Sequence, residues 1–204
     1  MNKKQYFLEI FGKAEKKYKN SQKRLAGEAW KEDWQTLFAT ILSAQSRDET
    51  TIPIAERLFK EYPALKSLSE AKFSEVTQIL KSINYYKTKS KHIITSAKII
   101  TENYNSKVPN TINELIKLPG VGRKTANLFL SEIHNQHTIT VDTHVHRISN
   151  VLEIVKTKSP HETEFALQKI APKHLWSKIN RYFVLWGKDC PSRDKKKLLA
   201  CLEK

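Results

Sequence analysis

Four residue types are scarce in this chain of 204 residues, which holds two cysteines, five glycines, one methionine and seven prolines. The two cysteines, Cys190 and Cys201, are too few for a disulfide framework, and a reducing, intracellular setting fits them best. The shortage of glycine and proline excludes a linker or a disordered chain. We therefore expect a folded protein of mainly regular structure.

Long hydrophobic runs are also absent. No segment approaches the roughly 18 apolar residues of a membrane span. The charged N-terminal stretch lacks the apolar core of a secretory signal. Its apolar residues instead recur at helical spacing: Tyr6, Phe7, Ile10, Phe11 and Ala14. The sequence predicts a soluble protein with no membrane partner.

Acidic residues are few relative to basic ones. Asp and Glu number 21, Lys and Arg number 36, and the formal net charge is +15. A folded domain this basic favours a polyanionic partner such as nucleic acid. A lysine-rich genome would give the same composition, so charge alone leaves both explanations open.

Apolar residues at helical spacing are abundant. They recur in the segments 33–45, 51–62, 69–83, 88–104, 111–118, 123–133, 141–154, 160–170 and 175–190. Asp33 is a suitable N-cap for the first of these, and Pro53 suits an early helical position in the second. The alternating segment "HTITV", residues 137–141, is too short to imply a sheet. The fold class predicted from these patterns is all-α.

The stretch "KLPGVGRKTANLFL", residues 117–130, places two glycines in a tight turn between two helices. Gly120 and Gly122 allow backbone angles denied to other residues and let the backbone approach a ligand. The next helix presents free N–H groups that suit a phosphate. By itself such a turn is more often a plain corner between helices, and the net charge favours the DNA-binding alternative.

Lys124 lies on the first turns of that second helix, beside Arg123. The positive end of a helix favours the neutral amine, which can attack a sugar C1′ and form a Schiff base. The local sequence alone favours the alternative of a lysine that contacts a phosphate or is simply solvated. Asp142, in "VDTHVHR", follows 18 residues later. It is either a helix N-cap or a carboxylate that assists the lysine. His144 and His146 are interpreted as packing or phosphate contacts rather than metal ligands.

Four motifs together resemble the endonuclease III family of the helix-hairpin-helix DNA glycosylase superfamily: "LPGVGRKTAN", "VDTHV", "ILSAQSRDETT" at 41–51 and "LKSINYYKTKSKHI" at 80–93. The resemblance spans roughly residues 25–190. It implies a two-lobed all-α fold with the active site in the cleft between the lobes. Residues 26–135 would form a helical barrel containing the helix-hairpin-helix at about 112–131, and residues 1–25 plus 136–204 would form the second helical domain.

The resemblance also implies a function. Such enzymes excise oxidised pyrimidines from duplex DNA and cleave the abasic strand by β-elimination. Lys124 would be the Schiff-base nucleophile and Asp142 its activating carboxylate. Gln45 would fill the gap left by the flipped nucleotide, and Tyr85 would wedge the opposite strand. The implied DNA contacts are Gln45, Arg47, Tyr85, Gly120, Val121, Gly122, Arg123, Thr125 and His144. We expect a monomer that binds double-stranded DNA with a damaged base or abasic site, in a prokaryotic cytoplasm and associated with the nucleoid through DNA.

The chain departs from the family pattern at the C-terminal cysteines, at Asn84 and at Tyr85, which replaces a more usual aliphatic residue or Phe. Many relatives end with four cysteines, spaced by six, two and five residues, that bind a [4Fe–4S] cluster. Here Lys197 and Ala200 replace two ligands, so no iron–sulfur cluster, other cofactor or metal is predicted. Asn84 replaces a usual glycine and can adopt the left-handed conformation. Two alternatives stay open: a glycosylase for uracil, mismatched thymine or oxidised guanine, and a DNA-binding module without catalysis.

Overall fold

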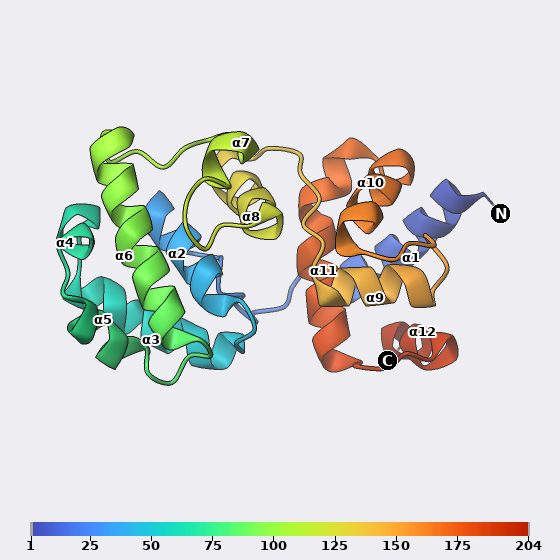
Figure 1. The fold of residues 1–204 in the computed structure, drawn as a ribbon. Helices are drawn as coiled ribbons and strands as arrows, with labels where there is room; N and C mark the ends of the chain where they lie inside the picture. The colour runs from blue at the N-terminus through green and yellow to red at the C-terminus, as the bar shows by residue number, and fades with distance from the viewer. Residues whose placement is uncertain (1, 204) are drawn as a thin grey trace. The chain divides into compact units, whose positions relative to one another are not determined.

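The computed structural model describes residues 2–203, and every regular element within that range is a helix. The all-α prediction is confirmed, and the segment 137–141 forms no strand. The chain divides into two compact units, one of Arg24–His134 and one of Met1–Lys23 with Asn135–Lys204 (Figure 1). Within residues 2–203, no helix is both long and apolar enough to cross a membrane.

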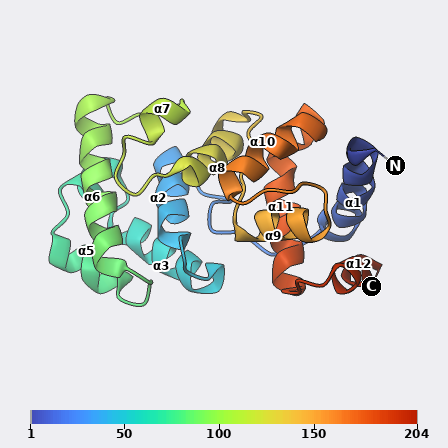
Figure 2. The ribbon, with the colours of Figure 1, turned by 45° about the vertical axis from the view of Figure 1, so that its right-hand side comes forward.

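The unit Arg24–His134 is built around one buried helix. Its elements are α2 (Asp33–Ser43), α3 (Asp48–Glu61), α4 (Leu65–Ser69), α5 (Phe73–Leu80), α6 (Tyr86–Asn103), α7 (Ile112–Leu115) and α8 (Arg123–His134). Helix α2 packs against α3, α6 and α8 (Figures 1 and 2). Nearly every residue of α2 is buried, which is typical of a helix surrounded by others. This core positions the loops at both ends of α2 and α6.

Two helix starts differ from the sequence prediction. The N-cap of α2 is Glu32 rather than Asp33, because the Gln35 side chain accepts the Glu32 amide at 3.1 Å. Helix α3 begins at Asp48, so Pro53 lies inside it rather than near its start. Two acidic residues in the first turn favour this earlier start through the helix dipole.

The other unit is organised around α11 (Trp176–Asp189). Its remaining elements are α1 (Lys3–Tyr18), α9 (Thr143–Val151), α10 (Pro160–Ile170), the 3₁₀ turn η1 (Lys173–Leu175) and α12 (Lys195–Glu203). Helix α11 packs against α1, α9 and α12, with Phe183 and Trp186 fully buried. This packing fixes the start of α9, where Asp142 lies.

The C-terminal segment is tied to α11 by a disulfide between Cys190 and Cys201. The two Cα atoms lie 6.5 Å apart, within the range that a disulfide spans. The sequence did not predict this bond, because it depends on how the fold brings two positions 11 residues apart together. From α9, the Arg147 guanidinium donates to the carbonyls of Gly187, Cys190 and Ser192 and holds the same turn.

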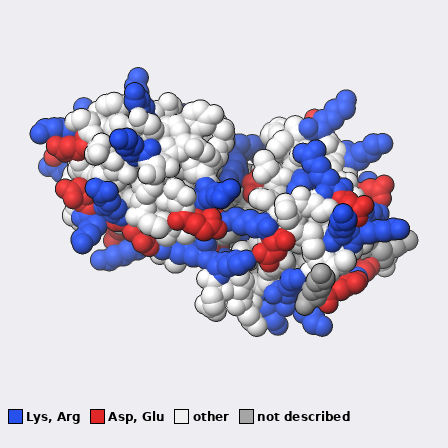
Figure 3. Space-filling view, turned by 90° about the horizontal axis from the view of Figure 1, so that it is seen from below, with Lys and Arg blue, Asp and Glu red and all other residues white. Residues whose placement is uncertain are grey.

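The basic side chains are spread over the molecule. Lysine and arginine occur across the face of both units that Figure 3 shows, with acidic side chains between them. Several lysines are paired with carboxylates at exposed positions, including Lys117 with Glu114 and Lys195 with Glu153. The charge favours a polyanionic partner in general but does not by itself locate a binding site.

Candidate active site

The hairpin between α7 and α8 is anchored by its apolar residues. Leu118 and Val121 are buried, and the Ser96 hydroxyl on α6 donates to the Pro119 carbonyl at 2.9 Å. The Val121 amide donates to the Leu118 carbonyl at 3.0 Å and closes the turn. That donor is used within the hairpin, so only the neighbouring amides would be available to a phosphate.

The two glycines of the hairpin have different roles. Gly120 has a φ of +82°, and a Cβ atom there would lie 2.9 Å from Nδ1 of His92 and 3.1 Å from Cγ2 of Ile41. Gly122 has no positive φ, and a Cβ atom there would meet nothing within 4 Å. The expectation of special backbone angles thus holds for Gly120 alone. Gly122 instead leaves open space in front of the N-terminus of α8.

Lys124 is exposed on the first turn of α8. The opposite face of this helix buries Ala126, Phe129 and Leu130, which directs Lys124 outward. Thr125 is only 7% exposed, so its side chain packs within this unit. The first amides of α8 carry the positive end of its dipole, so an anion bound there would lie near the lysine.

The loops that carry Gln45 and Tyr85 adopt unusual backbone conformations. Gln45 has a φ of 55° and Tyr85 a φ of 58°, in the left-handed region that few non-glycine residues occupy. The side chain of Gln45 is exposed, and Tyr85 is 65% exposed. An exposed aromatic ring on a strained loop is typical of a binding surface. The left-handed residue is Tyr85 and not Asn84, which corrects the expectation for Asn84.

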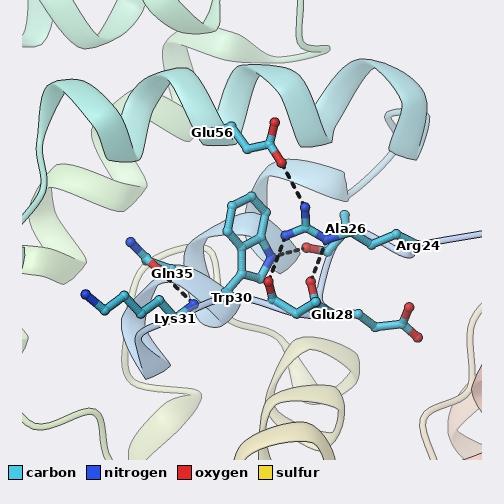
Figure 4. A network of polar contacts seen from close by, with 8 residues as sticks. Arg24, Ala26, Glu28, Trp30, Lys31, Gln35 and Glu56 are labelled. Atoms are coloured by element: carbon cyan, nitrogen blue, oxygen red, sulfur yellow. Dashed lines mark hydrogen bonds and ion pairs between the residues drawn. The ribbon is translucent and has the colours of Figure 1, made fainter.

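Arg47 follows Gln45 as the exposed N-cap of α3. Next to it, an Asp48 carboxylate oxygen accepts the amide of Ala26 at 3.2 Å. Figure 4 shows how the segment around Ala26 is held. The Trp30 indole donates to the Ala26 carbonyl at 2.6 Å, and the Arg24 guanidinium stacks on the Trp30 ring, 4.2 Å from its centroid. The loop after α2 is therefore fixed at its Asp48 end.

Lys89 is a buried charged residue beside the Gln45 loop that the sequence interpretation did not single out. It is only 6% exposed, and its Nζ donates to the Leu42 carbonyl at 2.9 Å, the Ala44 carbonyl at 2.6 Å and the Ser46 hydroxyl at 3.2 Å. Burial lowers the pKa of Lys89 to about 8. Lys89 lies four residues before Ile93 on the buried stripe of α6, so its burial could have been predicted, but its backbone partners could not.

Asp142 is the N-cap of α9, and its Oδ1 accepts the Val145 amide at 2.8 Å. The capping interpretation is therefore confirmed, and the cap holds the half-buried carboxylate in one orientation. His144 packs against Gly187, where a Cβ atom would collide with its ring. His146 shares a 2.7 Å hydrogen bond with Thr163. Both histidines have structural contacts, as the packing interpretation predicted.

The residues of this chain do not fit an iron–sulfur cluster. A cluster needs four thiolates as a rule, and the two cysteines present are bonded to each other. Within residues 2–203, no group of three or more His, Cys, Asp or Glu side chains is placed to hold a metal ion.

Comparisons with known proteins bear on the fold and the family of this chain. Residues 38–173 match the family model of the HhH-GPD superfamily base excision DNA repair protein. An endonuclease III of Thermotoga maritima is 42% identical over 155 residues, 76% of this chain and 73% of that protein. One of Buchnera aphidicola is 39% identical over 205 residues, 100% of this chain and 96% of that protein. A trapped endonuclease III–DNA covalent intermediate superposes with a TM-score of 0.85 at 32% identity, covering 94% of this chain and 93% of that one.

The helical fold and its glycine hairpin thus define a base excision DNA repair protein of the HhH-GPD superfamily. Within that superfamily the chain belongs to the endonuclease III family, since it aligns over most of its length with members at 39–42% identity. It is accordingly a base excision repair enzyme of the bifunctional glycosylase and abasic-site lyase class.

Proposed function

We propose that the protein excises oxidised pyrimidines from duplex DNA and cleaves the abasic strand through a Schiff base on Lys124. The observation that carries this proposal is the exposed Lys124 side chain on the first turn of α8, directly after the hairpin. A cation displayed beside a helix N-terminus is placed to meet the sugar next to a bound phosphate. Membership of the endonuclease III family supports this chemistry.

The reaction proceeds in two stages. The neutral Lys124 amine attacks C1′, the C1′–N bond breaks, and the base leaves with the bonding electrons and takes up a proton. Opening of the sugar ring gives a protonated Schiff base, which makes the C2′ protons acidic. Loss of one of them to a base expels the 3′ phosphate oxygen, which breaks the strand. Water then hydrolyses the imine and frees the lysine.

We assign Asp142 the role of activating Lys124 and stabilising the sugar cation. Its carboxylate takes a proton from the Lys124 ammonium before attack, and its negative charge stabilises the cationic sugar. The capping hydrogen bond from Val145 to Oδ1 supports this assignment, because it fixes the direction of the side chain.

DNA binding uses the hairpin and the two strained loops. The amides around Gly120 and Gly122 bind a phosphate at the start of α8. Once the damaged nucleotide is flipped out, Gln45 fills the gap and Tyr85 wedges the opposite strand. The net charge of +15 and the endonuclease III–DNA complexes among the similar structures support duplex DNA as the partner. Further DNA contacts stay predictions: Arg47, Val121, Arg123, Thr125 and His144.

The protein acts as a monomer and without an iron–sulfur cluster, in the prokaryotic cytoplasm where it associates with the nucleoid through DNA. The bacterial origin of the Thermotoga maritima and Buchnera aphidicola relatives supports this setting. Iron and acid-labile sulfide assays on the purified protein test the cluster, and light scattering tests the monomer. Stoichiometric iron and sulfide would contradict the first statement, and a dimer would contradict the second.

The function is tested with a panel of duplexes that carry thymine glycol, uracil, mismatched thymine, 8-oxoguanine or an abasic site. We expect base release from thymine glycol, strand cleavage at the abasic site, and a borohydride-trapped adduct with both. Lys124→Ala should abolish the adduct, whereas Lys117→Ala, an exposed lysine before the hairpin, should retain it. Base release without an adduct would indicate a monofunctional glycosylase, and DNA binding alone would indicate a non-catalytic module.

A further inference from the structure

Two loops that lie about 40 residues apart in the sequence are joined by two side chains, Asn84 just before α6 and Lys89 in its first turn. The first loop follows α2 and carries Gln45, and the second precedes α6 and carries Tyr85. The Asn84 side-chain amide donates to the Gln45 carbonyl at 2.5 Å. In the first turn of α6, the buried Lys89 side chain donates hydrogen bonds to the residues on both sides of Gln45. The two loops are therefore connected at the surface and in the core.

The Lys89 ammonium has three donors and finds three acceptors, on Leu42, Ala44 and Ser46. Two of the acceptors are carbonyls at the C-terminal end of α2, which lack intrahelical partners and favour a cation. These contacts lie on both sides of Gln45. They hold its flanking residues while Gln45 itself keeps the strained left-handed conformation.

A buried lysine is a costly way to fill this position. Burial alone lowers its pKa to about 8, which shows that the charged form is disfavoured where it lies. A leucine or methionine would fill the same space without that cost. We therefore explain the buried Lys89 by its role in positioning the Gln45 loop rather than by a contribution to the stability of the fold.

We propose that Lys89 and Asn84 are positioning residues that join the Gln45 and Tyr85 loops into one rigid element, which enters the duplex as a unit during nucleotide flipping. The inference rests on the proposed function, in which Gln45 fills the gap and Tyr85 wedges the opposite strand. It adds the requirement that the two insertions are coupled. Loosening either connection then slows the flipping step rather than the lysine chemistry.

The test compares two substrates in single-turnover assays. Thymine glycol paired with adenine has to be unstacked before excision, whereas a pre-formed abasic site has no base to unstack. We expect Lys89→Met to slow excision of thymine glycol by about tenfold or more, and abasic-site cleavage by less than about threefold. Asn84→Ala should also slow thymine glycol excision more than abasic-site cleavage, by a smaller factor than Lys89→Met. Lys89→Arg, which keeps the charge, should recover part of the loss.

Matched controls lie on the same helix. Lys91 is exposed two residues further on, so Lys91→Met removes the same charge without touching the Gln45 loop. If it acts at all, it should slow both substrates equally, as loss of a phosphate contact does. 2-Aminopurine placed opposite the lesion reports insertion directly. Its fluorescence rise on binding should be smaller with Lys89→Met and Asn84→Ala than with Lys91→Met.

Equal slowing of both substrates by Lys89→Met and Asn84→Ala, or no slowing by either, would overturn the proposal. If Lys89→Met does not fold, Asn84→Ala decides the matter alone, because its exposed side chain is removable without disturbing the core. If the protein without any substitution neither excises thymine glycol nor forms a trapped adduct, the proposed function itself is refuted. The two failures are therefore distinguishable.

Discussion

Gly120 packs against His92 so closely that a Cβ atom on the glycine would lie 2.9 Å from Nδ1 of the histidine. Its φ of +82° adds a second constraint, since other residues adopt this conformation at a cost. Gly120→Ala should therefore lower the free energy of unfolding by about 1–3 kcal/mol. Denaturant unfolding of the whole protein measures this change.

Gly122→Ala is the matched control two residues further on. A Cβ atom there meets nothing within 4 Å, so the free energy of unfolding should change by less than about 0.5 kcal/mol. The added methyl group stands where the phosphate would approach, so DNA affinity should fall. Equal destabilisation by the two changes, or unaltered DNA affinity of Gly122→Ala, would contradict this account of the hairpin.

Substitutions at Asp142 separate capping from catalysis. Asparagine caps helices as well as aspartate does, so Asp142→Asn should leave the free energy of unfolding nearly unchanged while removing the negative charge. Asp142→Ala should cost about 1 kcal/mol of stability, because the Val145 amide loses its partner. Both variants should lose most base release. If Asp142→Asn kept full activity, the carboxylate would be only a cap.

Titration of Lys89 is a further test of its environment. Burial lowers its pKa from 10.5 to about 8, so between these pH values the unfolded chain holds a proton that the folded chain has lost. The contribution of this group to the free energy of unfolding should therefore rise as pH increases from about 8 to 10.5. The difference in unfolding free energy between the unchanged protein and Lys89→Met measures it. A difference that is flat with pH would contradict the lowered pKa.

The disulfide between Cys190 and Cys201 should stabilise the docking of α12. Closing a loop of this length contributes at most about 3 kcal/mol. Dithiothreitol should therefore lower the Tm of the unchanged protein by several degrees and expose α12 to proteolysis. Cys201→Ser should show both effects without reductant and no further change with it. An equal response of this variant to dithiothreitol would show that the reductant acts elsewhere.

The helices could be predicted from the sequence because their apolar residues keep a clear period. The stripe Trp34, Leu37, Phe38, Ile41 in α2 is an example, and its burial is confirmed. The helix starts were less certain, because several polar residues compete as caps. The N-cap of α2 is Glu32 rather than the predicted Asp33, because the Gln35 side chain accepts a hydrogen bond from the Glu32 amide.

The candidate site was predictable in part. Lys124 and Asp142 could be named as candidates because each stands beside a local signal, a glycine hairpin and a helix start, and their catalytic roles stay predictions. Lys89 was missed because its partners are backbone carbonyls, which carry no sequence signal, and because α6 is rich in lysine. The Cys190–Cys201 bond was missed because it depends on how α12 returns to the end of α11.

Mapping of the trapped adduct tests the central claim most directly. The unchanged protein is reduced with borohydride on a duplex that carries an abasic site, digested, and sequenced by mass spectrometry. The account predicts a reduced sugar fragment on Nζ of Lys124, in the peptide that follows the hairpin. An adduct on another lysine, or efficient strand cleavage with no adduct at all, would contradict it.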